Sequence, residues 1–182
     1  MGDALAWIGQ IAEWVGRFVP RWQIVDPVHG AIKFVRGARV VPLGAGIHWY
    51  WPVTTEFHEY PIARQAVRLE PQNLTTTDGE VIVVVGVITY EIDDIEKILA
   101  HTYDPEETVR DVAATAIHDV CIRFSWEELR GEEREGTLNT KLRNEVQKGL
   151  KDYGVKVLKA MLSDLAPCPV FRLVQSMAKG GV

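Results

Sequence analysis

The chain has 182 residues, of which 47% are hydrophobic and 25% are charged, a composition ordinary for a globular protein. This length can bury one substantial core or two small lobes. The formal net charge of -5 excludes a general nucleic-acid binder, because neutralising phosphates requires clustered Lys and Arg.

The first 22 residues predict an amphipathic helix that lies in a membrane interface. On a helical wheel the apolar side chains fill one half, and Glu13 and Arg17 lie on the other. Pro20 ends the helix near Val19, which leaves about 16 residues and roughly 24 Å, too short for a bilayer core. Three Trp in this segment suit the headgroup level of a membrane. The side chains expected to bind membrane are Trp7, Ile8, Ile11, Trp14, Val15, Phe18 and Trp22.

The alternative to a membrane contact is protein packing. The apolar half of the same helix can rest on its own domain or on a neighbouring subunit. A cleaved signal peptide is not expected, because Asp3 precedes the apolar face and Glu13 interrupts it.

After residue 22 the hydrophobic pattern changes to that of short strands. Apolar runs separated by Pro or Gly predict strands at residues 24–25, 31–35, 39–41, 57–60 and 66–69. Between them, residues 43–52 hold two Gly and three consecutive aromatic side chains, which predicts a loop. We expect Trp49 and Trp51 of this loop to pack in the core. The alternative is that its aromatic tip, residues 47–51, dips into lipid.

Residues 81–92 predict the central strand of the fold. The run is dominated by β-branched residues, as expected for a strand that is buried along most of its length. The preceding residues 75–80 predict a tight turn. In that turn Asp78 can bond its own backbone and Gly79 is free to take a positive φ.

Helix-start signals follow the central strand. Asp93 and Asp94 can cap a helix at residues 95–101. Asp104 begins a second helix, residues 105–124, whose apolar positions step by three and four.

A capping box and a further amphipathic helix complete the second half. Ser125 and Glu128 have the spacing of the box, and Gly154 ends the later helix. Residues 155–165 then predict a closing strand. The apolar line of the later helix consists of Leu138, Leu142, Val146 and Leu150.

Three motifs occur in an order that is typical of one family. Residues 44–52 read GAGIHWYWP, residues 75–79 read TTTDG ahead of the valine-rich strand, and residues 153–157 read YGVKV after the amphipathic helix. In this order and spacing they resemble the SPFH domain, also called the Band 7 domain, of stomatin, prohibitin and flotillin relatives. The resemblance covers roughly residues 23–167.

The resemblance implies an α+β fold with a defined division of the chain. An antiparallel sheet lobe, residues 23–92, precedes a small helix-and-strand lobe, residues 93–167, and the amphipathic helix, residues 1–22, stands in front. Relatives usually continue into a long heptad-bearing helix, in place of which this chain has a short tail, residues 168–182. Apolar side chains of the tail have helix-like spacing and are expected to contact neighbouring subunits: Phe171, Leu173, Val174 and Met177.

No catalytic, cofactor or metal site is predicted. Cys121 lies three residues after His118, but residues at this spacing are neighbours in any helix, so the pair does not indicate a catalytic site. No Ser lies in the G-x-S-x-G sequence of an activated nucleophile. Cys121 and Cys168 lack metal-ligand spacing and are expected to be free thiols in a reducing environment. We therefore expect no enzyme activity.

For function, the resemblance implies a membrane-bound scaffold that forms rings or cages and organises lipids or holds membrane proteases. We expect a peripheral protein on the cytoplasmic face of a membrane, with lipid, copies of itself and a membrane protein or protease as partners, and no nucleic acid. The charge distribution gives weak support to a peripheral membrane protein. Residues 91–152 hold 16 acidic and 9 basic residues, whereas residues 1–40 hold 3 acidic and 5 basic residues. The alternative is a soluble interaction module whose N-terminal helix packs on a partner or a neighbouring subunit.

Overall fold

The computed structural model describes residues 19–168 as an α+β fold in which antiparallel sheets precede four helices and a final strand. This confirms the predicted class. The strands are β1 Arg21–Val25, β2 His29–Val35, β3 Arg39–Leu43, β4 Gly46–Tyr50, β5 Thr55–Pro61, β6 Gln65–Arg68, β7 Gln72–Thr75, β8 Val81–Ile92 and β9 Val155–Pro167. The helices are α2 Ile95–His101, α3 Pro105–Cys121, α4 Trp126–Glu135, α5 Thr137–Leu150 and a 3-10 turn, Lys151–Tyr153. The amphipathic helix expected before Pro20 lies outside the described residues.

Strand β8 is the centre of the larger sheet, as its valine-rich sequence predicts. It pairs antiparallel with β6 and β7 along one edge and with β9 along the other. Alternate side chains along β8 are fully buried, among them Ile82, Ile88 and Tyr90. A strand with neighbours on both edges and helices on one face has little surface left for polar residues, which explains its composition.

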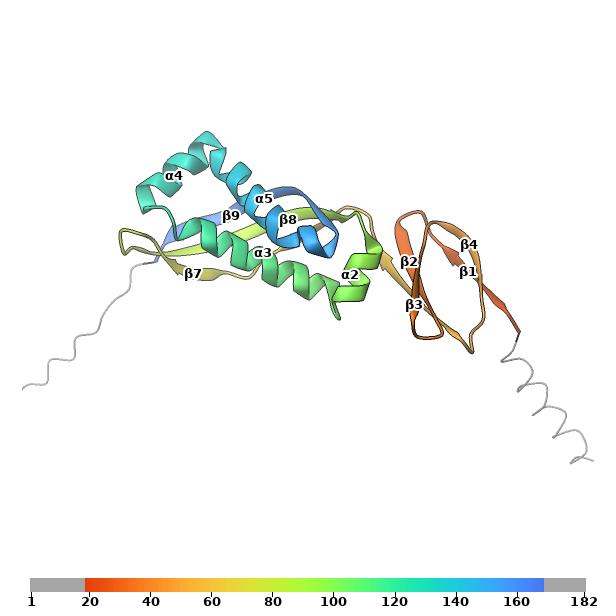
Figure 1. Ribbon diagram of the computed structural model, residues 1–182. Coiled ribbons are helices and arrows are strands. Elements are labelled where there is room, and N and C mark those ends of the chain that lie inside the picture. The colour runs from red at the N-terminus through yellow and green to blue at the C-terminus, as the bar shows by residue number, and fades with distance from the viewer. Residues whose placement is uncertain (1–18, 169–182) are drawn as a thin grey trace, which may run out of the picture.

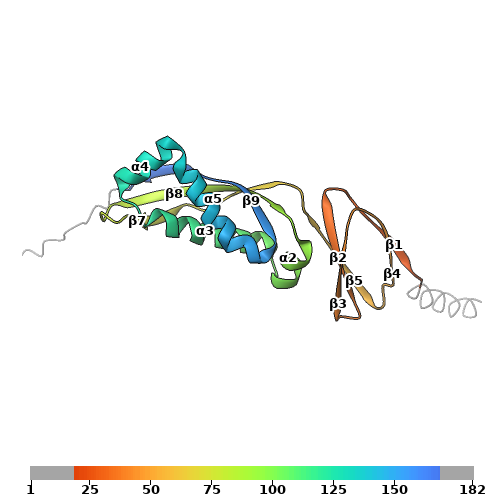
Figure 2. The ribbon, with the colours of Figure 1, turned by 45° about the horizontal axis from the view of Figure 1, so that its top comes forward.

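Helices α3 and α5 lie side by side along this sheet (Figures 1 and 2). The predicted apolar line of α5 is fully buried, and α3 buries Val109, Ala113 and Ile117. At Gly86 of β8 a Cβ would lie 2.6 Å from Ile117 Cδ1, so the missing side chain lets α3 approach the strand. The periodicity of both helices therefore identified their packed faces correctly.

The predicted helix starts are confirmed. The Asp94 carboxylate accepts a hydrogen bond from the Lys97 backbone N–H, and Asp104 accepts from two backbone N–H groups in the first turn of α3. Ser125 and Glu128 form the complete capping box. Helix α3 ends at Cys121, three residues earlier than predicted, because the Arg123 and Phe124 backbone N–H groups donate to Val120 and Cys121, three residues back instead of four.

The predicted turn before β8 is present, and it also makes a contact with helix α4 that was not predicted. Gly79 N–H donates to the Thr76 carbonyl oxygen, which closes the turn. The Asp78 carboxylate accepts from the Thr76 hydroxyl and from the backbone N–H of Trp126, the first residue of α4. These hydrogen bonds, that from Thr76 above all, hold the pKa of Asp78 below its usual range. The turn thus docks on the start of α4.

The smaller sheets use residues 21–61 differently from the prediction. Strand β2 pairs with β3 and β5, but residues 43–52, predicted to be a loop, contain strand β4, which pairs with β1. The strand was missed because its Gly-rich start and aromatic run lack the alternation that marks a half-buried strand. Its partner β1 lies more than 20 residues away in sequence.

The molecule is elongated, with strands β1–β5 at one end and the helices on the larger sheet beyond them (Figures 1 and 2). Helix α2 lies at the junction, where a Cβ at Gly30 of β2 would meet Ile95 at 2.7 Å. Strands β6–β8 share their sheet with β9, which follows the helices. The division of the chain at residue 92 stays a prediction; the sheet joins strands from both sides of it.

Gly154→Ala should cost more stability than Gly136→Ala, although both glycines have a positive φ, 71° and 76°. The left-handed backbone strains an L residue by about 1–2 kcal/mol at either site. A Cβ at Gly136 would meet open space, but at Gly154 it would lie 2.7 Å from the Asp94 carbonyl oxygen. In urea denaturation we expect losses of about 1 kcal/mol for Gly136→Ala and about 3 kcal/mol for Gly154→Ala. Equal losses would contradict close packing between α2 and the start of β9.

Candidate functional site

Exposed apolar side chains are concentrated at one end of the molecule. Nine large hydrophobic residues are exposed in the described part of the chain, and the ninth, Tyr103, follows α2. The other eight lie within residues 19–53: Val19, Trp22, Ile24, Val28, Ile47, Trp49, Trp51 and Val53. Such a concentration on one part of a domain's surface indicates a surface that contacts lipid or protein.

Four of these side chains share one face of the two-stranded β1–β4 ribbon. Trp22 lies opposite Trp49 and Ile24 lies opposite Ile47 in the antiparallel register. Residues two apart in a strand point to the same face, so all four side chains project together. We call Trp22, Ile24, Ile47 and Trp49 the apolar ribbon face.

The outward face of this ribbon departs from the usual pattern of a half-buried strand. The inward face holds Val25, which is 1% exposed, and Tyr50, whose ring lies 6.0 Å from that of Phe57 on β5. On the outward face Trp22 is 67% exposed and Trp49 is 59% exposed. An outward strand face is ordinarily polar, so the apolar ribbon face must be accounted for by something other than the domain's own core.

The exposed rings of Trp22 and Trp49 form an aromatic pair. The Trp22 and Trp49 rings lie 5.4 Å apart between centroids, with an interplanar angle of 71°, an edge-to-face arrangement. The two rings line a shallow hollow with Val19, Pro20 and Arg21. This hollow lies where the described structure begins, at the end of the segment predicted to be amphipathic, residues 1–22.

Covering the apolar ribbon face with lipid or protein would contribute several kcal/mol to binding. At about 25 cal/mol per Å² of buried apolar surface, each of its four side chains stabilises a contact by roughly 1 kcal/mol when covered. A total of about 4 kcal/mol does not by itself give tight binding, but it adds to the contribution of a neighbouring apolar segment.

The core packing predicted for Trp49 and Trp51 is wrong, because Trp49 projects outward and Trp51 is 54% exposed. Of the predicted membrane-binding residues, Trp22 is described and lies in strand β1. The other six, Trp7, Ile8, Ile11, Trp14, Val15 and Phe18, lie outside the described residues, as do the predicted subunit contacts Phe171, Leu173, Val174 and Met177. Sequence reasoning missed Ile24 and included Ile47 only in the alternative that residues 47–51 contact lipid; counting alternate positions across both strands would have found both.

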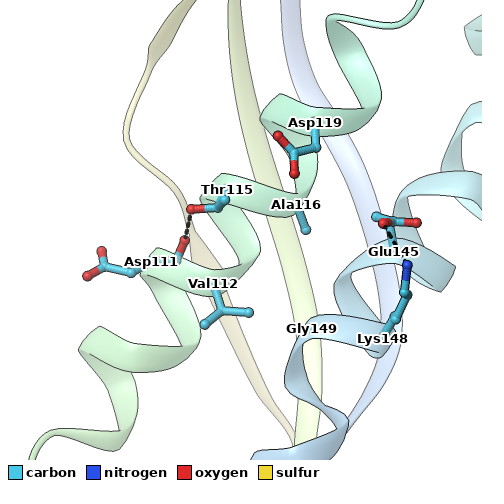
Figure 3. A pocket seen from close by; sticks show the side chains of 8 residues that line it. All are labelled: Asp111, Val112, Thr115, Ala116, Asp119, Glu145, Lys148 and Gly149. Atoms are coloured by element: carbon cyan, nitrogen blue, oxygen red, sulfur yellow. Dashed lines mark hydrogen bonds and ion pairs between the residues drawn. The ribbon is translucent and has the colours of Figure 1, made fainter.

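A second hollow, of about 420 Å³, lies between α3 and α5. Figure 3 shows Val112 and Ala116 directed toward α5, where a Cβ at Gly149 would lie 2.8 Å from Val112 Cγ1. Glu145 and Lys148 form an ion pair of 3.5 Å on its rim. Figure 3 also shows Asp111 turned away from α5, so the residues lining this hollow bring no nucleophile next to a base.

The cysteines give no reactive centre in the described chain. Cys121 and Cys168 are free, the first buried in α3 and the second exposed. Burial raises the pKa of the Cys121 thiol to about 12, which keeps it protonated and unreactive. Within residues 19–168, His, Cys, Asp and Glu side chains form no cluster that could hold a metal ion.

Comparison with known families identifies the fold. The sequence profile of the SPFH domain / Band 7 family matches residues 23–180, most of the chain. The chain belongs to this family. The resemblance found in the three sequence motifs is thereby confirmed, and the match extends beyond the expected limit, residue 167. The SPFH family consists generally of non-catalytic scaffolds that are often associated with membranes.

This SPFH protein is also similar to an uncharacterized protein of Methanocaldococcus jannaschii. The two are 22% identical over 144 residues, which span 79% of this chain and 71% of the relative. Among the described helices of the SPFH domain, none is long and apolar enough to cross a bilayer.

The Trp22 and Trp49 rings should be energetically coupled across the ribbon. An edge-to-face aromatic pair contributes about 0.5–1.5 kcal/mol beyond its buried area. In a double-mutant cycle of Trp22→Ala and Trp49→Ala, measured by urea denaturation, we expect a coupling near the lower limit because both rings are exposed. A cycle of Trp22→Ala with Trp51→Ala serves as the control. Equal coupling in both cycles would contradict the specific pairing.

Proposed function

We propose that this SPFH domain is a peripheral membrane scaffold whose β1–β4 end contacts the bilayer. The observation that carries the proposal is the apolar ribbon face, whose first residue, Trp22, is the last residue of the predicted amphipathic segment. Trp side chains at a membrane interface sit at the headgroup level, with the apolar body of the ring covered and its N–H solvated. Membership of the SPFH family supports the same conclusion.

The charge distribution favours this orientation on an anionic membrane. Residues 19–53 carry Arg21, Lys33, Arg36 and Arg39 against one acidic residue, Asp26. The described residues from 54 onward carry 22 acidic and 13 basic residues. An anionic cytoplasmic leaflet attracts the first part and repels the second, which holds the helices away from the surface.

Lateral association of copies is the second part of the proposal. In the described chain, β9 pairs only with β8, and its outer edge is open beyond Val157. At its start, Arg143 Nε donates to the Val157 carbonyl oxygen, and the Gln147 side chain bonds the backbone of Val155 and Val157. An open edge strand is a template for pairing with another chain, and a ring or cage would close such contacts.

The scaffold would organise lipid or hold a membrane protein, and a membrane protease is one such partner. A soluble interaction module is the competing function, because an exposed apolar face can equally cover a protein partner. Vesicle binding separates the two functions.

The triple variant Ile24→Thr, Ile47→Thr, Trp49→Thr should bind vesicles about 100-fold more weakly than the wild type. Each substitution removes roughly 1 kcal/mol of apolar burial while keeping a residue that strands accept. Co-flotation with anionic liposomes measures the effect, and Tyr103→Thr, at an exposed position remote from β1, is the matched control. Deletion of residues 1–18 leaves β1 intact and should weaken flotation further. Wild type that never floats would support the soluble module instead.

The tail variant Phe171→Asp, Leu173→Asp should reduce self-association. A charge placed in an apolar subunit contact must be desolvated, which weakens assembly. Mass photometry in mild detergent should show assemblies for the wild type and smaller species for the variant. Gln175→Asp adds a charge at a polar position of the same tail and should behave as wild type. A strictly monomeric wild type at micromolar concentration would rule out this part of the proposal.

A further inference from the structure

A basic hollow of about 540 Å³ adjoins the apolar ribbon face. Lys33, Arg36 and Arg39 contribute its charge, and Trp49 and Trp51 contribute its aromatic wall. No Asp or Glu is among the residues that line it. Trp49 also lines the hollow next to Trp22, so the charged and the apolar surfaces meet at this ring.

The basic side chains of this hollow form no ion pair with a carboxylate of residues 19–168. The six ion pairs among the described residues all lie between Glu91 and Lys156, and none includes Lys33, Arg36 or Arg39. Arg36 and Arg39 are exposed and Lys33 is half-buried. Three cations facing one hollow repel one another, so an anion in the hollow would relieve an unfavourable interaction.

The backbone at Arg36 supplies an independent observation. Residues 36–38 connect β2 to β3, and Val35 pairs with Arg39 across the connection. The Ala38 N–H donates to the Val35 carbonyl oxygen, which closes a β-turn whose two central residues, Arg36 and Gly37, have φ of 54° and 67°. The first central position of a turn with two positive φ values favours Asn, Asp or Gly. Arg36 is the one non-glycine residue with a positive φ in the described chain. Strain of this kind concentrates where a side chain has a function, which singles out the Arg36 guanidinium.

We propose that the basic hollow binds the phosphate of an anionic phospholipid headgroup while Ile24 and Ile47 of the apolar ribbon face contact the acyl region beside it. The proposal rests on the membrane function argued above and names its lipid class. Arginine can bind phosphate oxygens in a bidentate manner, and Trp49 and Trp51 would lie at headgroup depth. A free phosphate offers the same oxygens, but it makes no use of the adjoining apolar face, which decides in favour of the lipid.

The test uses the full chain and two vesicle compositions at equal ionic strength, phosphatidylcholine alone and phosphatidylcholine with phosphatidylserine. The wild type should bind the anionic vesicles more tightly. The double variant Arg36→Asn, Arg39→Gln should lose about 30-fold of that affinity, because each basic residue near an anionic surface contributes about 1 kcal/mol. Binding to the neutral vesicles should fall much less, because the choline ammonium of phosphatidylcholine offsets the charge of its phosphate and leaves no net surface potential. Asn suits the turn, so the variant should be at least as stable as the wild type.

Arg64→Gln, Arg68→Gln is the matched control, since it removes two exposed cations outside the hollow. This control should keep nearly all of the preference for anionic vesicles. Equal losses in the control and the hollow variant would overturn the headgroup site in favour of general charge attraction. A wild type that binds both compositions equally would also overturn it and would leave the membrane function standing. A wild type that binds neither would refute both proposals.

A titration with inorganic phosphate tests whether the hollow binds a free phosphate compound instead of a lipid headgroup. In a thermal-shift titration, the wild type should show no saturable stabilisation by phosphate at submillimolar concentration. Saturable stabilisation that is absent from the Arg36→Asn, Arg39→Gln variant, together with no preference between the vesicles, would assign the hollow to a free phosphate compound and overturn the lipid proposal.

Discussion

The packing of β8 is the constraint on which the rest of the described structure depends. This strand pairs with β6, β7 and β9, and its buried face supports α3 and α5. Because Gly86 has no side chain, Ile117 of α3 can sit directly over the strand. The closing strand β9 returns along almost the full length of β8, so the two ends of the larger sheet are fixed by one long antiparallel pair.

Local signals predicted this part of the fold well. The bounds of β8 and α2, the caps at Asp94 and Asp104, and the Ser125 capping box each depend on a few neighbouring residues, and the structure confirms them. The sequence alone did not predict which distant residue each polar group would hydrogen-bond. The hydrogen bond from the Trp126 N–H to Asp78 joins residues 48 positions apart and has no local pattern.

The candidate site was harder to predict because burial is not a property of residue type alone. Trp49 and Trp51 were expected in the core on their hydrophobicity, yet a large apolar residue can lie on a surface that serves a contact. Which side of the ribbon Trp49 occupies is decided by the register between β1 and β4, and a shift of one residue would have turned it inward. That register joins two distant segments, and each of them alone is ambiguous.

The end of strand β9 and the β1–β4 ribbon lie at opposite ends of an elongated molecule (Figures 1 and 2). Strand β9 runs from the α2 junction to the far end of β8, where the Cys168 N–H donates to the Val81 carbonyl oxygen. If the β1–β4 end sits on a bilayer, Cys168 lies a full domain length above the lipid. Copies of the domain that are joined only at the Cys168 end can then tilt relative to one another as the membrane curves.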